Sequence, residues 1–178
     1  IDNTSNSYGD DAIVTLSPRE HIRLRPGMYV GVVGDGSQPD EALYVLIKEV
    51  VDNSIDEFIM GAGRQIDITL ADNVVTVRDY GRGIPLKSLA AAVGQMNTGG
   101  KYGGDAFKKT VGLNGVGVKA VNMLSEEFTA RSVRDGEART VTFAKGLEVS
   151  DRWESGVNEK NGTFISYRVD KEIFGEYA

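Results

Sequence analysis

Three short motifs hold the residues whose types and spacing could do chemistry. Glu49 and Asn53 lie one helical turn apart, Asp79 ends an alternating strand just before a glycine turn, and the glycine-rich stretch 112–117 opens a second helix. A carboxylate can orient or deprotonate a water molecule, and an amide oxygen suits the hard cation Mg²⁺. A helix start offers free N–H groups to phosphate. Each motif alone is a weak signal, but the three in this order indicate a nucleotide-binding site.

The helical motif continues to Glu57. Glu49, Asn53 and Glu57 follow the spacing i, i+4, i+8 and form one stripe beside the apolar face of the helix. A stripe at that border can face a pocket between the helix and a sheet. Glu57 could instead pair with Arg82. For such a stripe alone, a solvated helix face is the commoner interpretation.

Asp79 shares the strand parity of Val75 and Val77, which should face the core. We therefore expect Asp79 in a buried or half-buried place, where a carboxylate must find hydrogen-bond donors. The 6-amino group of adenine is a suitable donor, and Gly81 and Gly83 allow the backbone to come near a ligand. The alternative is that Asp79 only organises the glycine turn.

The stretch 112–117 has the pattern G-x-x-G-x-G, which is neither the Rossmann fingerprint nor a Walker A loop. Its glycines would let backbone amides approach phosphate oxygens, and Lys101 and Lys119 on either side could supply charge. A flexible surface loop followed by an ordinary helix start is the alternative. Thr163 could share a water molecule with Asp79, although on spacing alone an exposed strand threonine is the better interpretation.

Hydrophobic periodicity and turn signals predict an α+β fold. Helices are expected at about 17–25, 41–60, 85–96 and 116–124, and strands at 65–70, 75–78, 127–134, 137–144 and 163–169. Asp72-Asn73 and Asp135-Gly136 mark hairpin turns, and 97–115 is a long unpatterned stretch of the kind that forms functional lids or stays disordered. The order of elements favours a two-layer sandwich in which helices back a mixed, mostly antiparallel sheet.

Composition narrows the class of protein. With 178 residues, 40% apolar and 26% charged, the chain is expected to form one domain, residues 17–178, behind a polar N-terminal arm, residues 1–16. The net charge of -6 disfavours a direct duplex-binding surface. The chain has no cysteine and a single histidine, His21, which disfavours thiolate, serine–histidine and histidine–metal chemistry. No apolar run is long enough to cross a membrane. Because the chain starts without Met, we expect an excised fragment.

These motifs together resemble the N-terminal ATPase domain of the bacterial type IIA topoisomerase ATPase subunits, the B subunits of DNA gyrase and topoisomerase IV, in the Bergerat-fold (GHKL) superfamily. The resemblance is carried by residues 5–8, 25–31, 49–57, 79–85, 98–101, 112–118 and 162–163. The segment 25–31 and the N-terminal arm separate these enzymes from chaperone, mismatch-repair and histidine-kinase ATP sites. The resemblance implies a Bergerat ATP-binding fold with an eight-stranded mixed sheet in the full domain.

The resemblance also implies roles for individual residues. Glu49 would be the catalytic general base, Asn53 would ligate Mg²⁺, and Asp79 would bind the adenine amino group directly and, with Thr163, through water. Residues 112–118 would wrap the triphosphate. The implied ATP-binding set is Tyr8, Asn53, Glu57, Asp79, Arg82, Gly83, Ile84, Pro85, Lys101, Gly112, Leu113, Asn114, Gly115, Val116, Gly117, Val118, Arg134 and Thr163. Within it, Tyr8 would reach the nucleotide of the other protomer in a dimer, and Arg82, Pro85 and Arg134 would line the rim where aminocoumarin-type inhibitors bind.

The implied function is that of an ATP-hydrolysing type II DNA topoisomerase in the cytoplasm. ATP binding would dimerise the ATPase subunits and close a gate for DNA strand passage, together with a DNA-cleaving subunit that handles DNA in the holoenzyme. Asn114 stands where many of these enzymes have His, which favours topoisomerase IV, and Phe107 lacks the hydroxyl of a lid tyrosine that can bond adenine. The chain ends before the transducer domain, so we expect it to bind nucleotide better than it hydrolyses it. The alternatives are another Bergerat-fold ATPase, of the chaperone or mismatch-repair type, or a nucleotide-binding module without turnover.

Overall fold

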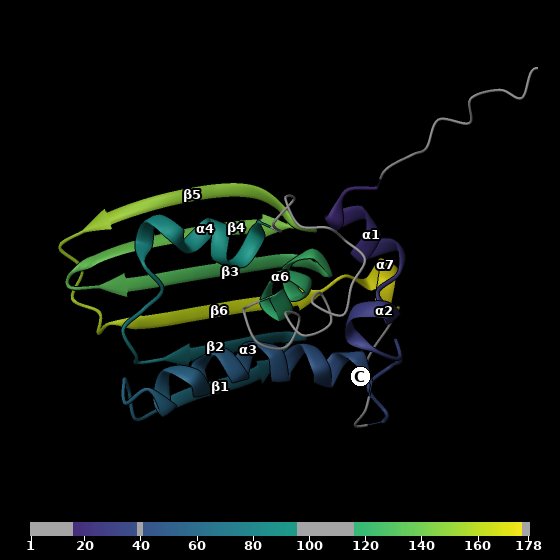
Figure 1. The fold of residues 1–178 in the computed structure, drawn as a ribbon, viewed down its shortest axis with the longest axis horizontal. Coiled ribbons are helices and arrows are strands. Elements are labelled where there is room, and N and C mark those ends of the chain that lie inside the picture. Colours follow the sequence, from purple (N-terminus) through teal and green to yellow (C-terminus); the bar gives the residue numbers. More distant parts are fainter. Residues whose placement is uncertain (1–15, 39–40, 96–115, 176–178) are drawn as a thin grey trace, which may run out of the picture.

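The computed structural model describes residues 16–38, 41–95 and 116–175 and has two layers, a sheet and a set of helices (Figure 1). In chain order the elements are α1 (Pro18–Leu24), α2 (Gly27–Val30), α3 (Ala42–Ile59), β1 (Ile66–Ala71), β2 (Val74–Asp79), a 3-10 turn (Leu86–Ser88), α4 (Leu89–Gly94), α6 (Val116–Met123), β3 (Ser125–Arg134), β4 (Glu137–Ala144), β5 (Leu147–Ser155), β6 (Gly162–Val169) and α7 (Lys171–Phe174). Helices α3, α4 and α6 lie over one face of the sheet, and α1, α2 and α7 gather at one end (Figure 1). The predicted α+β sandwich is confirmed.

The sheet has the strand order β1-β2-β6-β3-β4-β5, and each neighbouring pair in the described part is antiparallel. β6 lies between β2 and β3, so it joins the first hairpin to the later strands. Three two-residue turns with positive φ connect the hairpins, at Asp72-Asn73, Asp135-Gly136 and Lys145-Gly146. Such turns match the right-handed twist of the strands they join. The sequence predicted the first two and missed the third.

The strand after the third turn, β5, was also missed by the sequence analysis. β5 pairs only with β4 in the described part, at an edge of the sheet, and nearly all its residues are exposed. Leu147, Val149 and Trp153 alternate with polar residues along β5, but Asp151 interrupts the pattern, and all three apolar side chains are exposed. The eight strands implied for the full domain compare with six in the described part.

The core lies between the helical layer and the sheet. α3 buries Leu46, Val50 and Ser54, and β2 contributes Val75 and Val77. Phe58 follows these α3 residues at the same spacing of four, but 52% of Phe58 is exposed. Steps of four residues overshoot the helical turn by about 40° each, so three steps from Leu46 rotate a side chain by about 120°, away from the sheet.

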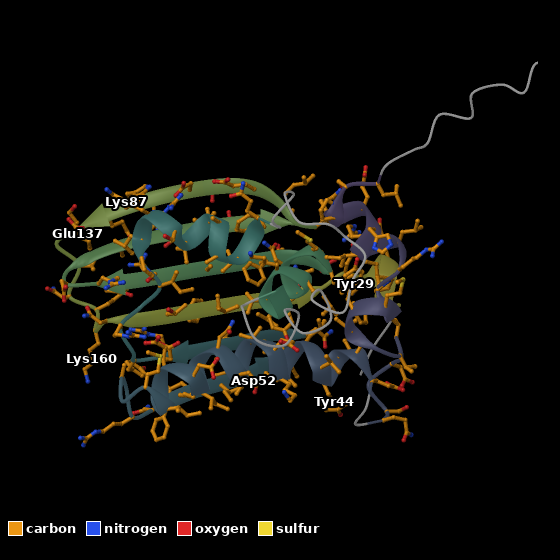
Figure 2. All side chains as sticks on the ribbon, in the orientation of Figure 1. Tyr29, Tyr44, Asp52, Lys87, Glu137 and Lys160 are labelled. Atoms are coloured by element: carbon orange, nitrogen blue, oxygen red, sulfur yellow. The ribbon has the colours of Figure 1, made fainter. Side chains whose placement is uncertain are left out.

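The predicted N-terminal helix begins at Ser17, which caps α1 in a capping box with Glu20. α1 is held to the end of the sheet because Arg23 donates to the buried carboxylate of Asp170 at 2.5 Å. His21 of α1 bonds Tyr29 of α2, at the end of the molecule where Figure 2 labels Tyr29. The sequence did not predict α2.

The helix predicted at 85–96 is shorter than expected. It begins as the 3-10 turn after Pro85, continues as α4 and ends at Gly94, because Gln95 adopts an extended conformation. No helix in the described ranges combines the length and apolar character that a membrane span requires.

Candidate functional site

A cavity of about 460 Å³ opens between α3, α4, α6 and the loop that follows β2. Its lining mixes charged and apolar side chains: Val50, Asn53, Ser54, Asp56, Glu57, Asp79, Arg82, Gly83, Ile84, Pro85, Ala92, Val93, Val118, Lys119, Arg134, Thr163 and Ile165. Segments far apart in the sequence therefore meet at one place. A cavity on which polar groups from several elements converge beside apolar walls is typical of a small-molecule site.

Asp79 lies at the inner wall of this cavity with 6% of its surface exposed. The burial predicted from strand parity is confirmed. Its Oδ1 accepts backbone N–H bonds from Gly81 at 3.1 Å and Thr163 at 3.0 Å, and its Oδ2 accepts a bond from the Ser54 hydroxyl at 3.1 Å. A carboxylate has acceptor sites beyond these three, so Asp79 can accept a further bond from a donor in the cavity.

Two glycines allow the chain to pack closely around Asp79. Gly162 has φ 142°, and a side chain there would overlap the Asp79 backbone and the Arg78 guanidinium. Gly83 has φ 79°, and a Cβ would lie 2.8 Å from the Val133 carbonyl oxygen. Both conformations strain any residue with a side chain. Gly162 thus leaves room for the Asp79 backbone, and Gly83 lets the loop after β2 come close to β3.

The Thr163 hydroxyl bonds the loop that follows β2. Its oxygen accepts the N–H of Ile84 at 3.2 Å, while the backbone N–H of Thr163 bonds Asp79. The exposed strand threonine favoured on spacing alone is wrong, because 8% of Thr163 is exposed. Thr163 therefore ties the loop after β2 to the neighbouring strand β6.

Glu57 and Arg82 form an ion pair at the rim of the cavity. The Arg82 guanidinium donates to both carboxylate oxygens, at 2.8 and 3.2 Å, and its backbone N–H donates at 3.1 Å. The bond from the Arg82 side chain holds the pKa of Glu57 below its ordinary value. The alternative in which Glu57 pairs with Arg82 is thus what the structure shows.

Glu49 lies outside the cavity lining, against α6. Its carboxylate lies beside Gly117, the second residue of that helix. Burial raises the pKa of Glu49, the Lys48 ammonium opposes this, and the Asp52 carboxylate adds to it. Lys48 and Asp52 form their own ion pair at 2.5 Å on the exposed part of α3, where Figure 2 labels Asp52.

Asn53 and Lys119 are two polar side chains that reach the cavity without a bond to described residues. Asn53 is exposed on α3, one turn from Glu49. Lys119 lies on α6, and burial lowers the pKa of its ammonium. A partly buried cation without a carboxylate partner favours an anionic ligand. Lys119 flanks the glycine motif in the sequence, but it was not in the set implied by the resemblance.

The structure brings much of the predicted set to the cavity: Asn53, Glu57, Asp79, Arg82, Gly83, Ile84, Pro85, Val118, Arg134 and Thr163. Glu49 and Gly117 contact each other beside it. Val116 begins α6. Tyr8, Lys101, Gly112, Leu113, Asn114 and Gly115 lie outside the described residues, as does Phe107. Sequence reasoning named Lys119 as a possible charge beside the glycine motif but missed the wall residues Val50, Ser54, Asp56, Ala92, Val93 and Ile165. Ser54, a small polar residue at a core position of α3, was the available signal for a buried bond to Asp79.

Several known proteins are similar in sequence. The family model for histidine kinase-, DNA gyrase B-, and HSP90-like ATPases matches residues 39–171. The B subunit of DNA topoisomerase 4 from Borreliella burgdorferi is 51% identical over 174 residues, which are 98% of this chain and 29% of that protein. The B subunit of DNA gyrase from Staphylococcus epidermidis is 37% identical over 185 residues, 99% of this chain and 28% of that protein. The chain thus spans less than a third of the length of these relatives.

A solved structure is similar in fold. The 43K ATPase domain of Thermus thermophilus gyrase B, in complex with an aminocoumarin, superposes with a TM-score of 0.72 and 28% sequence identity, over 90% of this chain and 42% of that one. Since the family model also matches most of the chain, the protein belongs to the family of histidine kinase-, DNA gyrase B- and HSP90-like ATPases.

Proposed function

We propose that this chain is the ATP-binding and ATP-hydrolysing module of a type II DNA topoisomerase. The observation that carries the proposal is the buried Asp79 carboxylate, which faces the cavity with acceptor capacity to spare. Membership of the ATPase family and the similarity to topoisomerase subunits support it.

The geometry at Asp79 suits adenine. The 6-amino group of adenine would donate to the carboxylate, whereas guanine has an acceptor, O6, at the same place. Guanine O6 and the Asp79 carboxylate would face each other without a donor between them, and leaving buried polar groups unpaired weakens binding. The apolar walls formed by Ile84, Val93 and Ile165 would hold the faces of the base. Thr163 would add a bridging water between Asp79 and the base.

The phosphates would extend from the base toward α6 and Asn53. The α6 N-terminus and Lys119 would supply positive potential, and the predicted residues Lys101 and 112–118 would add amide and charge donors. In the described part no group of three or more His, Cys, Asp or Glu could hold a metal ion. Mg²⁺ fits such a site because it keeps several waters and binds phosphate oxygens, so one protein oxygen, that of Asn53, is enough. When bound there, Mg²⁺ would neutralise phosphate charge.

Glu49 would orient and deprotonate the attacking water. Burial raises the pKa of its carboxyl, which makes it a stronger base than an exposed glutamate. The distance from Asn53 along α3 is one turn, so the base and the metal ligand would approach the terminal phosphate together.

The larger assembly is proposed from the relatives. ATP would close a homodimer in which Tyr8 reaches the nucleotide of the other protomer, and a DNA-cleaving subunit would complete the enzyme in the cytoplasm. The 51% identity to a topoisomerase 4 protein supports topoisomerase IV over gyrase. The cavity rim at Arg82, Pro85 and Arg134 would accept aminocoumarin-type inhibitors, as the similar gyrase B domain binds one.

The proposal is tested in the full-length protein combined with its DNA-cleaving partner. We expect ATP-dependent strand passage through duplex DNA, and loss of that activity in Glu49→Gln. Nucleotide binding without any hydrolysis by the full-length protein would instead support a binding module. On relaxed circular DNA, net introduction of negative supercoils would overturn the preference for topoisomerase IV.

A further inference from the structure

Gly117 occupies the place in α6 that lies against Glu49. A Cβ built on Gly117 would overlap the Glu49 carboxyl group and would lie only 2.8 Å from its Cγ. Glycine is therefore the residue that leaves room for the Glu49 side chain as it stands. The contact joins α3 to the first turn of α6, two helices that pack together across the site.

The backbone gives no reason for glycine at this position. Gly117 has no left-handed φ, unlike Gly83 and Gly162, and it lies within a regular helix. Glycine favours a helical conformation less than alanine does. The missing side chain at Gly117 thus has a local cost, and the neighbour that would be displaced is Glu49.

We propose that Gly117 is a positioning residue that seats the Glu49 carboxylate against the start of α6. This inference rests on the proposed function, in which Glu49 is the base. An alanine there pushes against the far end of a flexible side chain, so the chain keeps its fold while the carboxylate moves. The expected result is a base in the wrong place within an intact nucleotide site.

A direct contact between Gly117 and phosphate, as implied by the resemblance, makes a different prediction. If Gly117 served only to let its amide approach phosphate, alanine would weaken nucleotide affinity. If it seats Glu49, alanine lowers turnover at saturating ATP and leaves affinity nearly unchanged. The division of the effect between affinity and turnover therefore separates the two roles.

The experiment compares glycine-to-alanine variants of the full-length protein in two measurements, calorimetric affinity for a non-hydrolysable ATP analogue and ATP turnover. For Gly117→Ala we expect affinity within about threefold of wild type and turnover lowered at least tenfold. Gly27→Ala is the matched control, because Gly27 also lies in a helix and has no neighbour within 4 Å of a Cβ. Gly94→Ala shows the effect of an overlap with a rigid group, because the new Cβ would lie 2.7 Å from the Phe143 ring. The melting temperature of this variant should fall.

A double-mutant cycle completes the test. In the Glu49→Gln background, Gly117→Ala should cause no further loss of turnover, because both changes disable one base. The inference is overturned if Gly117→Ala lowers turnover equally in both backgrounds. It is also overturned if Gly117→Ala turns over ATP at the wild-type rate, or if only its nucleotide affinity falls. If Gly117→Ala fails to fold, the Glu49→Ala/Gly117→Ala pair should fold, since the overlapping group is gone; an unfolded pair contradicts the inference. If Glu49→Gln hydrolyses ATP at the wild-type rate, the proposed function of Glu49 is itself contradicted.

Discussion

The two ends of the cavity differ in how completely their polar groups are bonded. Around Asp79, three donors from α3, the glycine turn and β6 hold one carboxylate, and Gly162 leaves room for the Asp79 backbone. Around α6, Asn53 and Lys119 reach the cavity without partners among the described residues. The first end is assembled by the fold alone, whereas the second presents groups that suit an added anion and cation.

Under the proposed function, this difference separates recognition of the base, at the Asp79 end, from phosphate chemistry, at the α6 end. A pre-formed acceptor can select a base without reorganising, because its hydrogen bonds already hold it in place. Asn53 and Lys119, which have no hydrogen-bond partners among the described residues, are free to bind the phosphates and their cation. Changes at the Asp79 end should therefore act on affinity for any adenine compound, and changes at the α6 end on phosphates and turnover.

The largest effect is expected at the α6 end, from Glu49→Gln. The amide keeps the shape of the side chain but cannot take a proton, so turnover should fall by about 10²–10⁴ with nucleotide affinity retained. Because burial raises the pKa of Glu49, and the base acts in its deprotonated form, wild-type turnover should fall as pH drops through a value above the usual glutamate pKa of about 4.3. A steady-state pH profile measures both effects. If turnover of Glu49→Gln falls at low pH as it does in the wild type, the titrating group is not Glu49.

The next effect is expected at the other end, from Asp79→Asn. Replacing the carboxylate removes a charged acceptor worth about 1.5–3 kcal/mol, a loss of roughly 10- to 150-fold in affinity. The loss should be the same for ATP and for adenosine, which share the base. Asp151→Asn, on β5 and bonded to Arg139, is the matched control and should bind normally. Calorimetry that found unaltered binding by Asp79→Asn would remove Asp79 from base recognition.

A smaller effect is expected from Lys119→Met. The exchange keeps the apolar stem and removes the charge, so ATP affinity should fall by about fivefold, the scale of one partly exposed ion pair. Adenosine binding should not change, because adenosine has no phosphate. Lys87→Met, at the exposed position labelled in Figure 2, controls for net charge. Equal weakening of ATP and adenosine would mean that Lys119 shapes the pocket rather than contacting phosphate.

The smallest effect concerns the rim pair of Glu57 and Arg82. A carboxyl whose folded-state pKa is lowered stabilises the fold above its unfolded-state pKa, and this contribution is lost as pH falls through the lowered value. Wild-type protein should therefore lose stability on acidification below about pH 4.3 slightly faster than Glu57→Gln, since exposed ion pairs contribute little. Chemical unfolding at several pH values measures the difference. Parallel curves would mean that the pair adds nothing to stability.

Local patterns predicted much of this molecule. Strand parity placed Asp79 in the interior, and turn residues with positive φ located two hairpins. The helical spacing on α3 put Asn53 and Glu57 on the cavity side. These features depend on residues close together in the chain, so the sequence carries them directly.

Features that depend on distant contacts were not predictable. Ser54 bonds Asp79 across 25 residues, and Gly117 meets Glu49 only because α3 and α6 pack together. β5 was missed for another reason: Asp151 interrupts the alternation of its apolar residues Leu147, Val149 and Trp153. Phe58 is exposed, although it continues the spacing of Leu46, Val50 and Ser54, because a repeat of four residues drifts around the helix.

The central claim is that the buried Asp79 carboxylate makes this cavity selective for adenine. Calorimetric titration of the full-length protein with non-hydrolysable analogues of ATP and GTP, with and without Mg²⁺, tests it most directly. We predict Mg²⁺-sensitive binding of the adenine analogue and at least tenfold weaker binding of the guanine analogue. Equal affinity for the two analogues would contradict the claim.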